Sequence, residues 1–385
     1  MGTPSFDSGA SADSGAGADA TPASGCPTTW RLSLAASVKD LHIDSSGTIF
    51  VASKVGARAS VAAIDPCGTL RASRDFEVPG ATSAVGTGIT ASGGKLYVAG
   101  NMVPREGGDP RDGFVAQVDP STLAVDWTTR LTGSSGADEV WDIEALDGSL
   151  WVTGNANGPN TWIVKLPTTQ ATCGPPCGFS PFGGAGRRLF AANGKMYVGG
   201  RIPAPAPATL HEAFAVTFDS AARCDAPPCD FERDNSVIFT DAENGVSRNT
   251  EVRGMLVVGN DAYVAGFSYE DPNDLRGVVV RIDLRTAKAT SYVLDQPGTK
   301  DGFVGIATDG THIYAVGGQG WTDDMSKVQP VIVKLTMSDL KEVWKRTPPD
   351  KGFYNSVRVV GGNGLIIVGG DPAGVMRRCL TDGSC

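Results

Sequence analysis

The chain has 385 residues, among them 50 glycines and 24 prolines. This content argues against a helical bundle, because both residues destabilise helix interiors. The net charge of −9 argues against a surface for nucleic acid or for anionic membranes. The apolar content of 41% suffices for a folded core, and the sequence has no apolar run long enough to span a bilayer.

The N-terminal segment differs in composition from the rest. Residues 1–25 are mostly Ser, Ala, Gly and Asp, which bury too little apolar surface to become ordered, so we expect a flexible tether. The segment resembles the one that follows the lipidated cysteine of bacterial lipoproteins. This resemblance implies an exported outer-membrane lipoprotein in which Met1 replaces a cleaved signal sequence and its lipid-bearing cysteine. The alternative is a secreted or periplasmic protein with a disordered N-terminus.

Residues 26–385 contain a repeated apolar strand with an aromatic residue near its start and a small residue at its end. The aromatic positions are Phe50, Tyr97, Trp151, Tyr197, Tyr263 and Tyr314, with Ile366 in the seventh place. These positions follow one another at intervals near fifty residues, which is the range of a propeller blade.

Each repeat has the same internal order. A first strand leads to a turn dipeptide such as Asp147-Gly148 or Asn193-Gly194, which tolerates positive φ, and then to the aromatic strand. A variable loop, a third strand ending in an Asp-like turn and a more polar fourth strand follow. Short strands without a helical period predict an all-β fold, a seven-bladed β-propeller of four-stranded antiparallel blades.

The last repeat reaches Cys385 before its fourth strand. Residues 29–34 match the fourth-strand segments that contain Trp127 and Trp344. We therefore expect the N-terminal strand to complete the last blade, which closes the ring and removes exposed sheet edges.

Two segments carry a resemblance to a known family: LYVAGN…DGFVAQVDPSTLAVDW and AYVAGF…RGVVVRIDLRTAKATSY. They resemble the bacterial seven-bladed β-propeller repeat of secreted proteins and lipoproteins of Gram-negative bacteria. The resemblance covers residues 26–385 and implies the fold and a place in the cell envelope, with little information about activity. Repeats two and six match the Asp-Gly-type start of the third strand in part, whereas repeats three and seven depart from it.

Eight cysteines, with many Gly, Ser and Thr and few Lys, predict disulfides and an oxidising compartment. Cys173 and Cys177 form one close pair and Cys224 and Cys229 another, each around a Pro-Pro, which suits stapled loops. A four-cysteine zinc site is the alternative for these two pairs. For the remaining four cysteines, we expect Cys26–Cys385 to lock the ring, which leaves Cys67 with Cys379.

Residues at the start of each blade are expected to surround the mouth of a central funnel, on the face that carries the variable loops between second and third strands. They are Asp40, Asp138, Glu139, Asp142, Arg187, Arg188, Glu251, Arg253, Lys300, Asp301, Tyr354, Asn355 and Arg358. Such a mixed ring could bind a polar ligand. The alternative is a solvated entrance with salt bridges between blades.

Two of the variable loops are rich in carboxylates, which are the ligands that calcium prefers. The residues are Glu106, Asp109 and Asp112 in one loop and Glu270, Asp271 and Asp274 in the other. A calcium site is one interpretation, and solvated Asp-Pro turns are the other.

Catalytic signatures are scarce in the sequence. His42, His211 and His312 share no blade position, and neither a Gly-x-Ser-x-Gly elbow nor a phosphate-binding loop occurs. We therefore expect a monomeric, non-catalytic propeller of the cell envelope that binds a protein or glycan through the loops of one face, without a cofactor. The alternative is a propeller enzyme, of the lyase or quinone-dependent dehydrogenase type, with its site in the central funnel.

Overall fold

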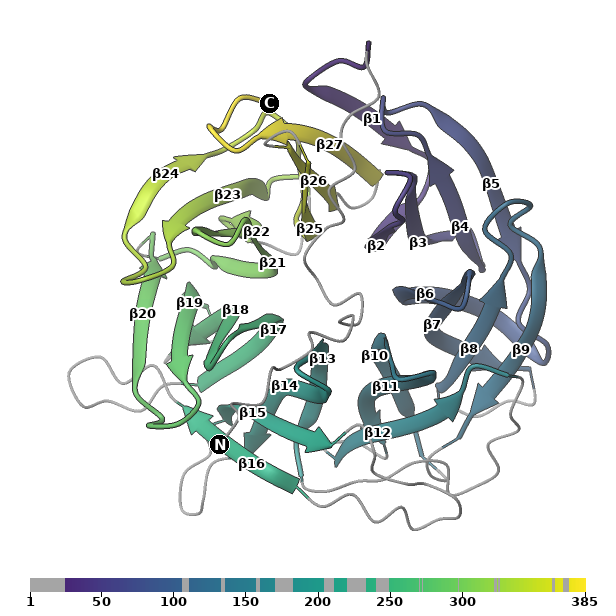
Figure 1. The fold of residues 1–385 in the computed structure, drawn as a ribbon, viewed down its shortest axis with the longest axis horizontal. Helices are drawn as coiled ribbons and strands as arrows, with labels where there is room; N and C mark the ends of the chain where they lie inside the picture. The colour runs from purple at the N-terminus through teal and green to yellow at the C-terminus, as the bar shows by residue number, and fades with distance from the viewer. Residues whose placement is uncertain are drawn as a thin grey trace, which may run out of the picture.

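A computed structural model describes most of the chain. It covers residues 25–105, 111–132, 136–156, 160–169, 183–203, 211–219, 233–239, 249–269, 271, 273–296, 298–321, 324, 326–361, 364–369 and 374–385. These residues form 27 strands in seven antiparallel sheets arranged in a ring (Figure 1). In the described part of the chain, no helix is long and apolar enough to cross a membrane.

The sheets follow the chain as blades, each with its first strand innermost (Figure 1). Blade 1 comprises β2 (Ser37–Ile43), β3 (Ile49–Val55), β4 (Arg58–Ile64) and β5 (Leu70–Phe76), and blade 2 comprises β6 (Ala81–Ser92), β7 (Lys95–Pro104), β8 (Asp112–Val118) and β9 (Val125–Leu131). Blade 3 comprises β10 (Asp138–Leu146), β11 (Ser149–Ala156) and β12 (Asn160–Pro167), and blade 4 comprises β13 (Ala185–Ala192), β14 (Lys195–Pro203), β15 (His211–Asp219) and β16 (Arg233–Phe239).

Three further blades complete the ring. Blade 5 comprises β17 (Asn249–Val258), β18 (Asp261–Tyr269), β19 (Leu275–Asp283) and β20 (Ala289–Leu294), and blade 6 comprises β21 (Gly302–Thr308), β22 (His312–Gln319), β23 (Gln329–Thr336) and β24 (Glu342–Arg346). Blade 7 comprises β25 (Tyr354–Val360), β26 (Gly364–Gly369) and β27 (Gly374–Leu380), with β1 (Trp30–Leu34) as its outer strand. As expected, the N-terminal strand therefore completes the last blade, with Trp30 opposite Arg378.

An ionic group at this closure, which we call the seam cluster, consists of Asp350, Arg31, Arg377 and Tyr354. Asp350 accepts hydrogen bonds from Arg31 Nε at 2.9 Å, from Tyr354 Oη at 2.7 Å and from Arg377 Nε. The cluster joins β1, β27 and the segment before β25. It therefore ties the N-terminal strand to the last blade through side chains as well as through the sheet.

The disulfides differ from the expected pairing. Cys26 is bonded to Cys67 and Cys379 to Cys385, so both predicted pairs, Cys26–Cys385 and Cys67–Cys379, are wrong. The indole of Trp30 donates to the carbonyl of Pro66, which brings the chain before β1 onto the third turn of blade 1, beside Cys67.

The second bond has an equally local cause. After β27, Leu380 N–H donates to the carbonyl of Ser384, so a tight turn returns Cys385 to Cys379. The bond from Cys26 still locks the ring, because it fastens the strand of blade 7 to blade 1. The pairs Cys173/Cys177 and Cys224/Cys229 lie outside the described residues.

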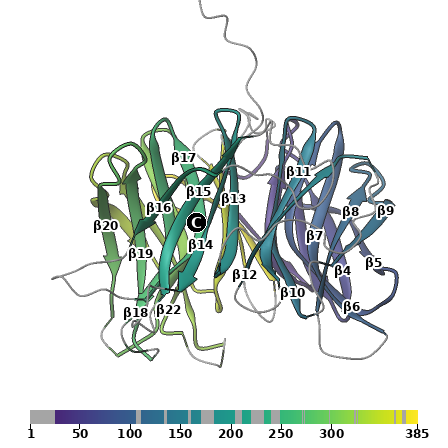
Figure 2. The ribbon, with the colours of Figure 1, turned by 90° about the horizontal axis from the view of Figure 1, so that it is seen from below.

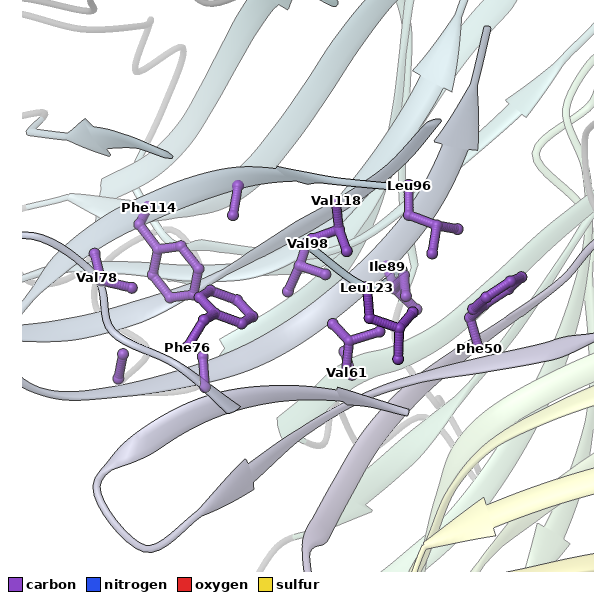
Figure 3. Packing of buried hydrophobic residues seen from close by; sticks show 14 of the residues in the cluster. Phe50, Val61, Phe76, Val78, Ile89, Leu96, Val98, Phe114, Val118 and Leu123 are labelled. Carbon is purple, nitrogen blue, oxygen red and sulfur yellow. The ribbon is translucent and has the colours of Figure 1, made fainter. Parts of the chain in front are cut away.

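The hydrophobic core is divided into seven clusters, one between each pair of neighbouring blades. Figure 3 shows the cluster between blades 1 and 2, where Phe76 packs edge to face on Phe114 and Phe50 lies near Ile89. The repeated aromatic residue is a packing residue in these clusters: Tyr97, Trp151 and Tyr314 are all almost fully buried. Such a core needs both neighbours of every blade, and a closed ring supplies them.

The two faces of the ring are distinct. Because the strands alternate in direction, the hairpins between first and second strands share one face with the turns between third and fourth strands; we call it the turn face. The opposite loop face carries the loops between second and third strands and the connections between blades. Figure 2 shows the strands running between these two faces.

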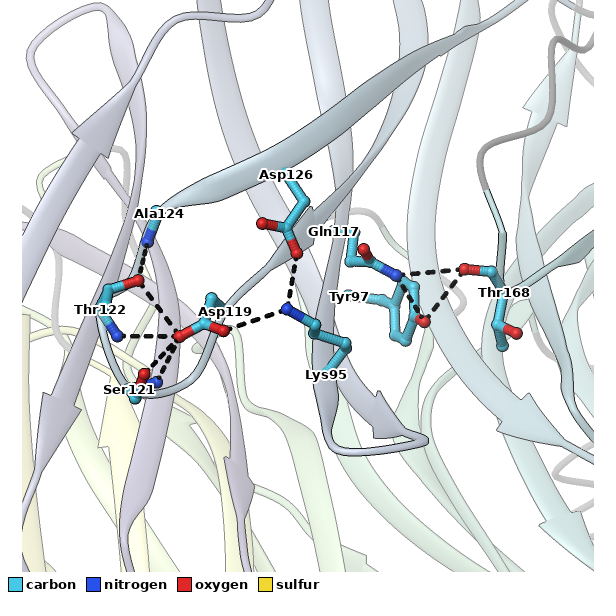
Figure 4. A network of polar contacts seen from close by, with 9 residues as sticks. All are labelled: Lys95, Tyr97, Gln117, Asp119, Ser121, Thr122, Ala124, Asp126 and Thr168. Carbon is cyan, nitrogen blue, oxygen red and sulfur yellow. Dashed lines mark hydrogen bonds and ion pairs between the residues drawn. The ribbon is translucent and has the colours of Figure 1, made fainter.

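Polar side chains close the turn face. In Figure 4, the Asp119 carboxylate accepts hydrogen bonds from Ser121 and Thr122 in its own turn and from Lys95 at 3.0 Å. The hydroxyl of Tyr97 donates to the carbonyl of Thr168 in the next blade at 3.1 Å. The same type of contact joins Tyr263 to Met337, Lys334 to Thr381 and Trp30 to Pro66. The described groups of this face are thus largely occupied by contacts within the ring.

Candidate functional site

Every innermost strand carries a β-bulge at the same position. In blade 3, for example, the register shifts between Val140 and Asp142, which leaves Trp141 unpaired. The unpaired residues of the seven blades are Lys39, Thr87, Trp141, Arg187, Arg253, Val304 and Asn355. A bulge re-aims a side chain, and here it does so once per blade around the ring axis.

In most blades the bulge lies opposite the glycine near the end of the repeated aromatic strand. A Cβ on Gly100 would overlap the carbonyl of Val85, and one on Gly154 would overlap the carbonyl of Glu139. Gly266, Gly317 and Gly369 face equivalent carbonyls. In these five blades the backbone of the bulged inner strand lies close against the second strand, and glycine leaves the space. Blade 1 has the same bulge with Ser53 at the equivalent position.

The bulges of blades 3, 4 and 5 bring together a group that we call the axial cluster: Trp141, Arg187, Arg201, Glu251 and Arg253. The guanidinium of Arg187 lies over the Trp141 ring at 4.1 Å, and that of Arg253 lies 5.7 Å from the same ring. The contact of Arg253 with Trp141 spans blade 4, so these side chains converge toward the axis. Trp141 and Glu251 lie near the start of inner strands and Arg201 lies near the end of β14, which places the cluster toward the loop face.

Glu251 is the centre of this cluster. Its carboxylate contacts Arg253 Nη2 at 2.8 Å, Arg187 Nε at 2.9 Å and Arg201 Nη1 at 2.9 Å. Burial alone would raise the pKa of Glu251, but the three guanidinium groups hold it below its usual value. Glu251 therefore stays ionised in a site from which water is largely excluded.

Several buried polar atoms of the cluster, on the arginines and on Glu251, lack a hydrogen-bond partner among the residues that the structure describes. These atoms are Arg187 Nε and Nη1, Arg253 Nε and Glu251 Oε1. Burial lowers the pKa of Arg187 to about 10, although the charge of Glu251 opposes this shift. The cluster thus has buried cationic donors without hydrogen bonds beside a carboxylate that three guanidinium groups approach within 3 Å.

Two aspartates of the predicted ring act as clamps between blades. Asp142 accepts backbone hydrogen bonds from Ile143 in its own blade and from Leu189 in the next blade, both at 2.9 Å. Asp40 accepts a hydrogen bond from Ser356 Oγ at 2.8 Å across the closure between blades 7 and 1. These hydrogen bonds join neighbouring blades, as the alternative of cross-blade contacts at the entrance expects.

Glu144 lies two residues after Asp142 in β10. Burial, reinforced by the negative charges of Asp142 and Asp40, raises its pKa to about 8, while Arg358 opposes the shift. Burial likewise raises the pKa of Asp142, against the charge of Arg188. Glu144 is therefore mostly protonated at neutral pH, a property that its sequence context did not indicate.

The other predicted residues of the mouth lie apart from the axial cluster or at its rim. Glu139 pairs with Arg111 at 2.5 Å, and Asp301 is fully buried where it caps the backbone of Gln296 and Gly320. Tyr354 is also buried and belongs to the seam cluster, because it precedes the bulge of its strand. Asp138 is buried and Lys300 is partly exposed in the segment before blade 6.

An aromatic group that the sequence analysis missed continues the axial cluster. Arg253 lies over the ring of Phe267 at 5.4 Å, Phe267 contacts Trp321 edge to face at 6.3 Å, and Trp321 contacts Phe353 at 4.9 Å. Trp321 follows β22 on the loop face and is partly exposed. A tryptophan directly after a strand-ending glycine in a variable loop was the available signal.

The carboxylate loops show no metal centre in their described part. Asp112 is buried and accepts a hydrogen bond from Arg130 Nε at 2.5 Å. In the Asp271–Asp274 turn, Asp271 accepts hydrogen bonds from the backbone N–H groups of Asn273 and Asp274. Glu106, Asp109 and Glu270 lie outside the described residues. No group of three metal-ligating side chains occurs among the residues that the structure covers.

The histidines are dispersed as the sequence indicated. His42 is in β2 of blade 1, His211 begins β15 of blade 4, and His312 begins β22 of blade 6, with its Nδ1 3.3 Å from Asp309. These three positions cannot form one triad or one metal site.

The comparison with known proteins is based on this ring of seven blades, each with a β-bulge in its innermost strand. The chain is a seven-bladed β-propeller. The solved structure of Drosophila Plexin A in complex with Semaphorin 1b matches it with a TM-score of 0.58 and 8% identity, over 95% of this chain and 88% of that chain. The structure of the Dos1 propeller matches with a TM-score of 0.50 and 11% identity, over 89% of this chain and 77% of that chain.

At such identities the likeness concerns the fold alone. No protein-family model matches the chain, and no curated protein sequence matches it. The function of this propeller must therefore be argued from its own side chains.

Proposed function

We propose that this protein is an exported, non-catalytic binding propeller that takes a protein or glycan partner on its loop face, at the axial cluster. The observation that supports this most directly is the contrast between the faces. On the loop face, Arg201 and Arg253 are partly exposed near a buried carboxylate, and Phe267 connects Arg253 to the partly exposed Trp321. On the turn face, the described polar groups bond to one another.

Two further findings are consistent with the proposal. The disulfides Cys26–Cys67 and Cys379–Cys385 indicate an extracellular or exported protein, because such bonds persist in oxidising compartments. One of the similar solved structures is that of Drosophila Plexin A in complex with Semaphorin 1b. Arginine and tryptophan are also the residues that most often dominate binding energies at protein interfaces.

The proposal includes a tether to the cell envelope through residues 1–25. An upstream gene segment that encodes an apolar stretch ending in cysteine would support a lipid anchor. An upstream sequence without such a stretch would leave an exported protein that is free of lipid.

The experiment that tests binding compares the two faces. The full chain is immobilised and exposed to a native envelope extract, and captured molecules are quantified by mass spectrometry. A loop-face variant, Trp321→Ala with Arg253→Ala, is expected to lose at least about tenfold of the partner captured by the wild type, the scale of one or two hot-spot residues. The turn-face control, Arg285→Ala with Lys341→Ala, changes two strongly exposed side chains and should capture normally. Equal capture by both variants would refute a loop-face site.

The alternative, an enzyme with its site near the axis, has one observation in its favour. Glu144 is held protonated at neutral pH, which is the state that a general acid requires. None of the three histidines lies in its blade. The binding function accounts for more of the described residues.

A further inference from the structure

The charges of the axial cluster do not balance. Arg187, Arg201 and Arg253 contribute three positive charges and Glu251 one negative charge, so the group carries two net positive charges. The neighbouring ion pairs, Arg111 with Glu139 and Arg188 with Asp142, cancel internally. This excess stands in a protein whose net charge is −9.

An excess of buried charge is costly unless a counter-charge accompanies it. The side chain of Arg187 is only 8% exposed, and its Nη1 is unpartnered among the described residues. Arg253 Nε is also without a hydrogen-bond partner there. Two independent observations, the net charge of the cluster and its donors without hydrogen bonds, therefore favour an anionic ligand.

The exposed fractions show which arginines a ligand could reach. The side chains of Arg201 and Arg253 are 32% and 26% exposed, whereas that of Arg187 is 8% exposed. Arg201 and Arg253 both contact Glu251, which fixes the orientation of their guanidinium groups before a ligand binds. A planar guanidinium is well suited to an oxyanion, because its donors match two oxygens at once.

We propose that the axial cluster is an oxyanion-binding subsite, in which Arg201 and Arg253 take a carboxylate or sulfate group of the loop-face ligand and Arg187 supplies charge from behind. The inference rests on the proposed function and adds the chemical class of the ligand. Phe267, under Arg253, and Trp321, which contacts Phe267, provide apolar surface for the part of the ligand that carries the anionic group. Glu251 limits the affinity, because it already neutralises part of the cationic charge.

Two small probes distinguish the sources of the anionic group. Isothermal titration calorimetry of the full chain with sodium glucuronate and with sodium sulfate at low ionic strength should show binding of at least one of them. The heat of binding should fall when sodium chloride is raised to 0.2 M, since exposed charges are screened beyond a Debye length of about 8–10 Å. Preference for glucuronate would assign a carboxylate ligand, and preference for sulfate a sulfated one.

Charge variants give results of opposite sign. Arg201→Gln should weaken probe binding about tenfold, which is the effect of losing one charge-assisted hydrogen bond. Glu251→Gln removes the competing carboxylate and should strengthen binding several-fold. Arg285→Gln, on the turn face and 70% exposed, is the matched control and should bind as the wild type does. If Glu251→Gln does not fold, Arg253→Gln replaces it, with weaker binding expected.

The inference is overturned if neither probe binds the wild type, or if Arg201→Gln and Arg285→Gln bind the probes equally. These outcomes are separable from a failure of the proposed function. Loss of partner capture in the loop-face variant without any anion binding would retain the binding face and remove only the oxyanion subsite.

Discussion

The seam cluster and the axial cluster both bury a carboxylate among arginines, but they differ in how completely the groups are used. At the seam, Asp350 is bonded by Arg31, Arg377 and Tyr354, and these donors hold its pKa at about 2 although burial alone would raise it. At the axis, three guanidinium groups lie close to Glu251, but Arg187, Arg253 and Glu251 Oε1 all retain buried atoms without a hydrogen-bond partner in the described chain.

This difference distinguishes a structural ion pair at the seam from a group of charges at the axis that is suited to bind a ligand. The pKa of Arg377 is raised, since its bonds to Asp350 outweigh burial, whereas burial lowers the pKa of Arg187 to about 10. The surroundings of Arg377 thus favour its charged form, whereas those of Arg187 disfavour its charged form. We expect stability to depend on the seam and ligand binding to depend on the axis.

The sharpest way to break this comparison is a matched pair of substitutions. Arg377 and Arg187 have side chains that are each 8% exposed and paired with a buried carboxylate. Arg377→Met leaves Asp350 without its buried cation and should cost about 3–5 kcal/mol of unfolding free energy. Arg187→Met leaves Glu251 with two arginines and should change stability by about 1 kcal/mol or less.

Urea denaturation of the two variants and the wild type measures both values. Equal losses in Arg377→Met and Arg187→Met would show that the axial arginines are structural in the same sense as those of the seam.

The disulfides test the seam by another route. The Cys26–Cys67 bond closes a loop with a sequence separation of 41, and the Cys379–Cys385 bond one of 6. The chain-entropy argument then gives losses of about 4 kcal/mol for Cys26→Ser with Cys67→Ser and about 2 kcal/mol for Cys379→Ser with Cys385→Ser. Thermal melts of the two double variants compare them. A larger loss from the shorter loop would mean that the ring is not fastened at Cys26.

The pH dependence of stability tests the protonation state of Glu144. The folded pKa of Glu144, about 8, is raised from 4.5, so the folded state binds the proton more tightly and stability falls as pH rises through that window. Glu144→Gln removes this penalty. It should gain about 2 kcal/mol at pH 8, allowing for its partial exposure, and less than about 1 kcal/mol at pH 5.

Melting temperatures at pH 5 and pH 8 measure this effect, with the exposed Glu77→Gln as control. A gain of equal size at both pH values would exclude a protonated Glu144. Asp350 has the opposite sign: its lowered pKa means that its contribution is lost only as pH falls toward about 2.

Local features of the fold were predictable from the sequence because local chemistry decides them. The turn dipeptides at Asp147 and Asn193 adopt positive φ, as their residue types indicate, and the repeated aromatic residues pack between blades. The position of β1 in blade 7 was also predictable, because a repeat that lacks its fourth strand must find one elsewhere in a closed ring.

The site was predictable only in part. Arg187, Glu251 and Arg253 were among the expected residues, but Trp141, Arg201 and Trp321 were not, because their approach depends on bulges and on the angle between blades. Tyr354 moved to the seam for the same reason: a single unpaired residue reverses the side on which a neighbouring side chain lies. The cysteine pairing failed because the path of the chain before β1 is decided by packing against blade 1.

The sequence by itself determined the number of blades, the strand order within them and the closure of the ring, since periodicity, turn residues and strand-ending glycines act over a few residues. Only the tertiary structure decided which charges meet at the axis and which cysteines are bonded. Arg187 and Arg201 reach Glu251 from another blade, about fifty residues or more away in the chain, where burial and the closeness of other charges replace local propensity as the controlling energy.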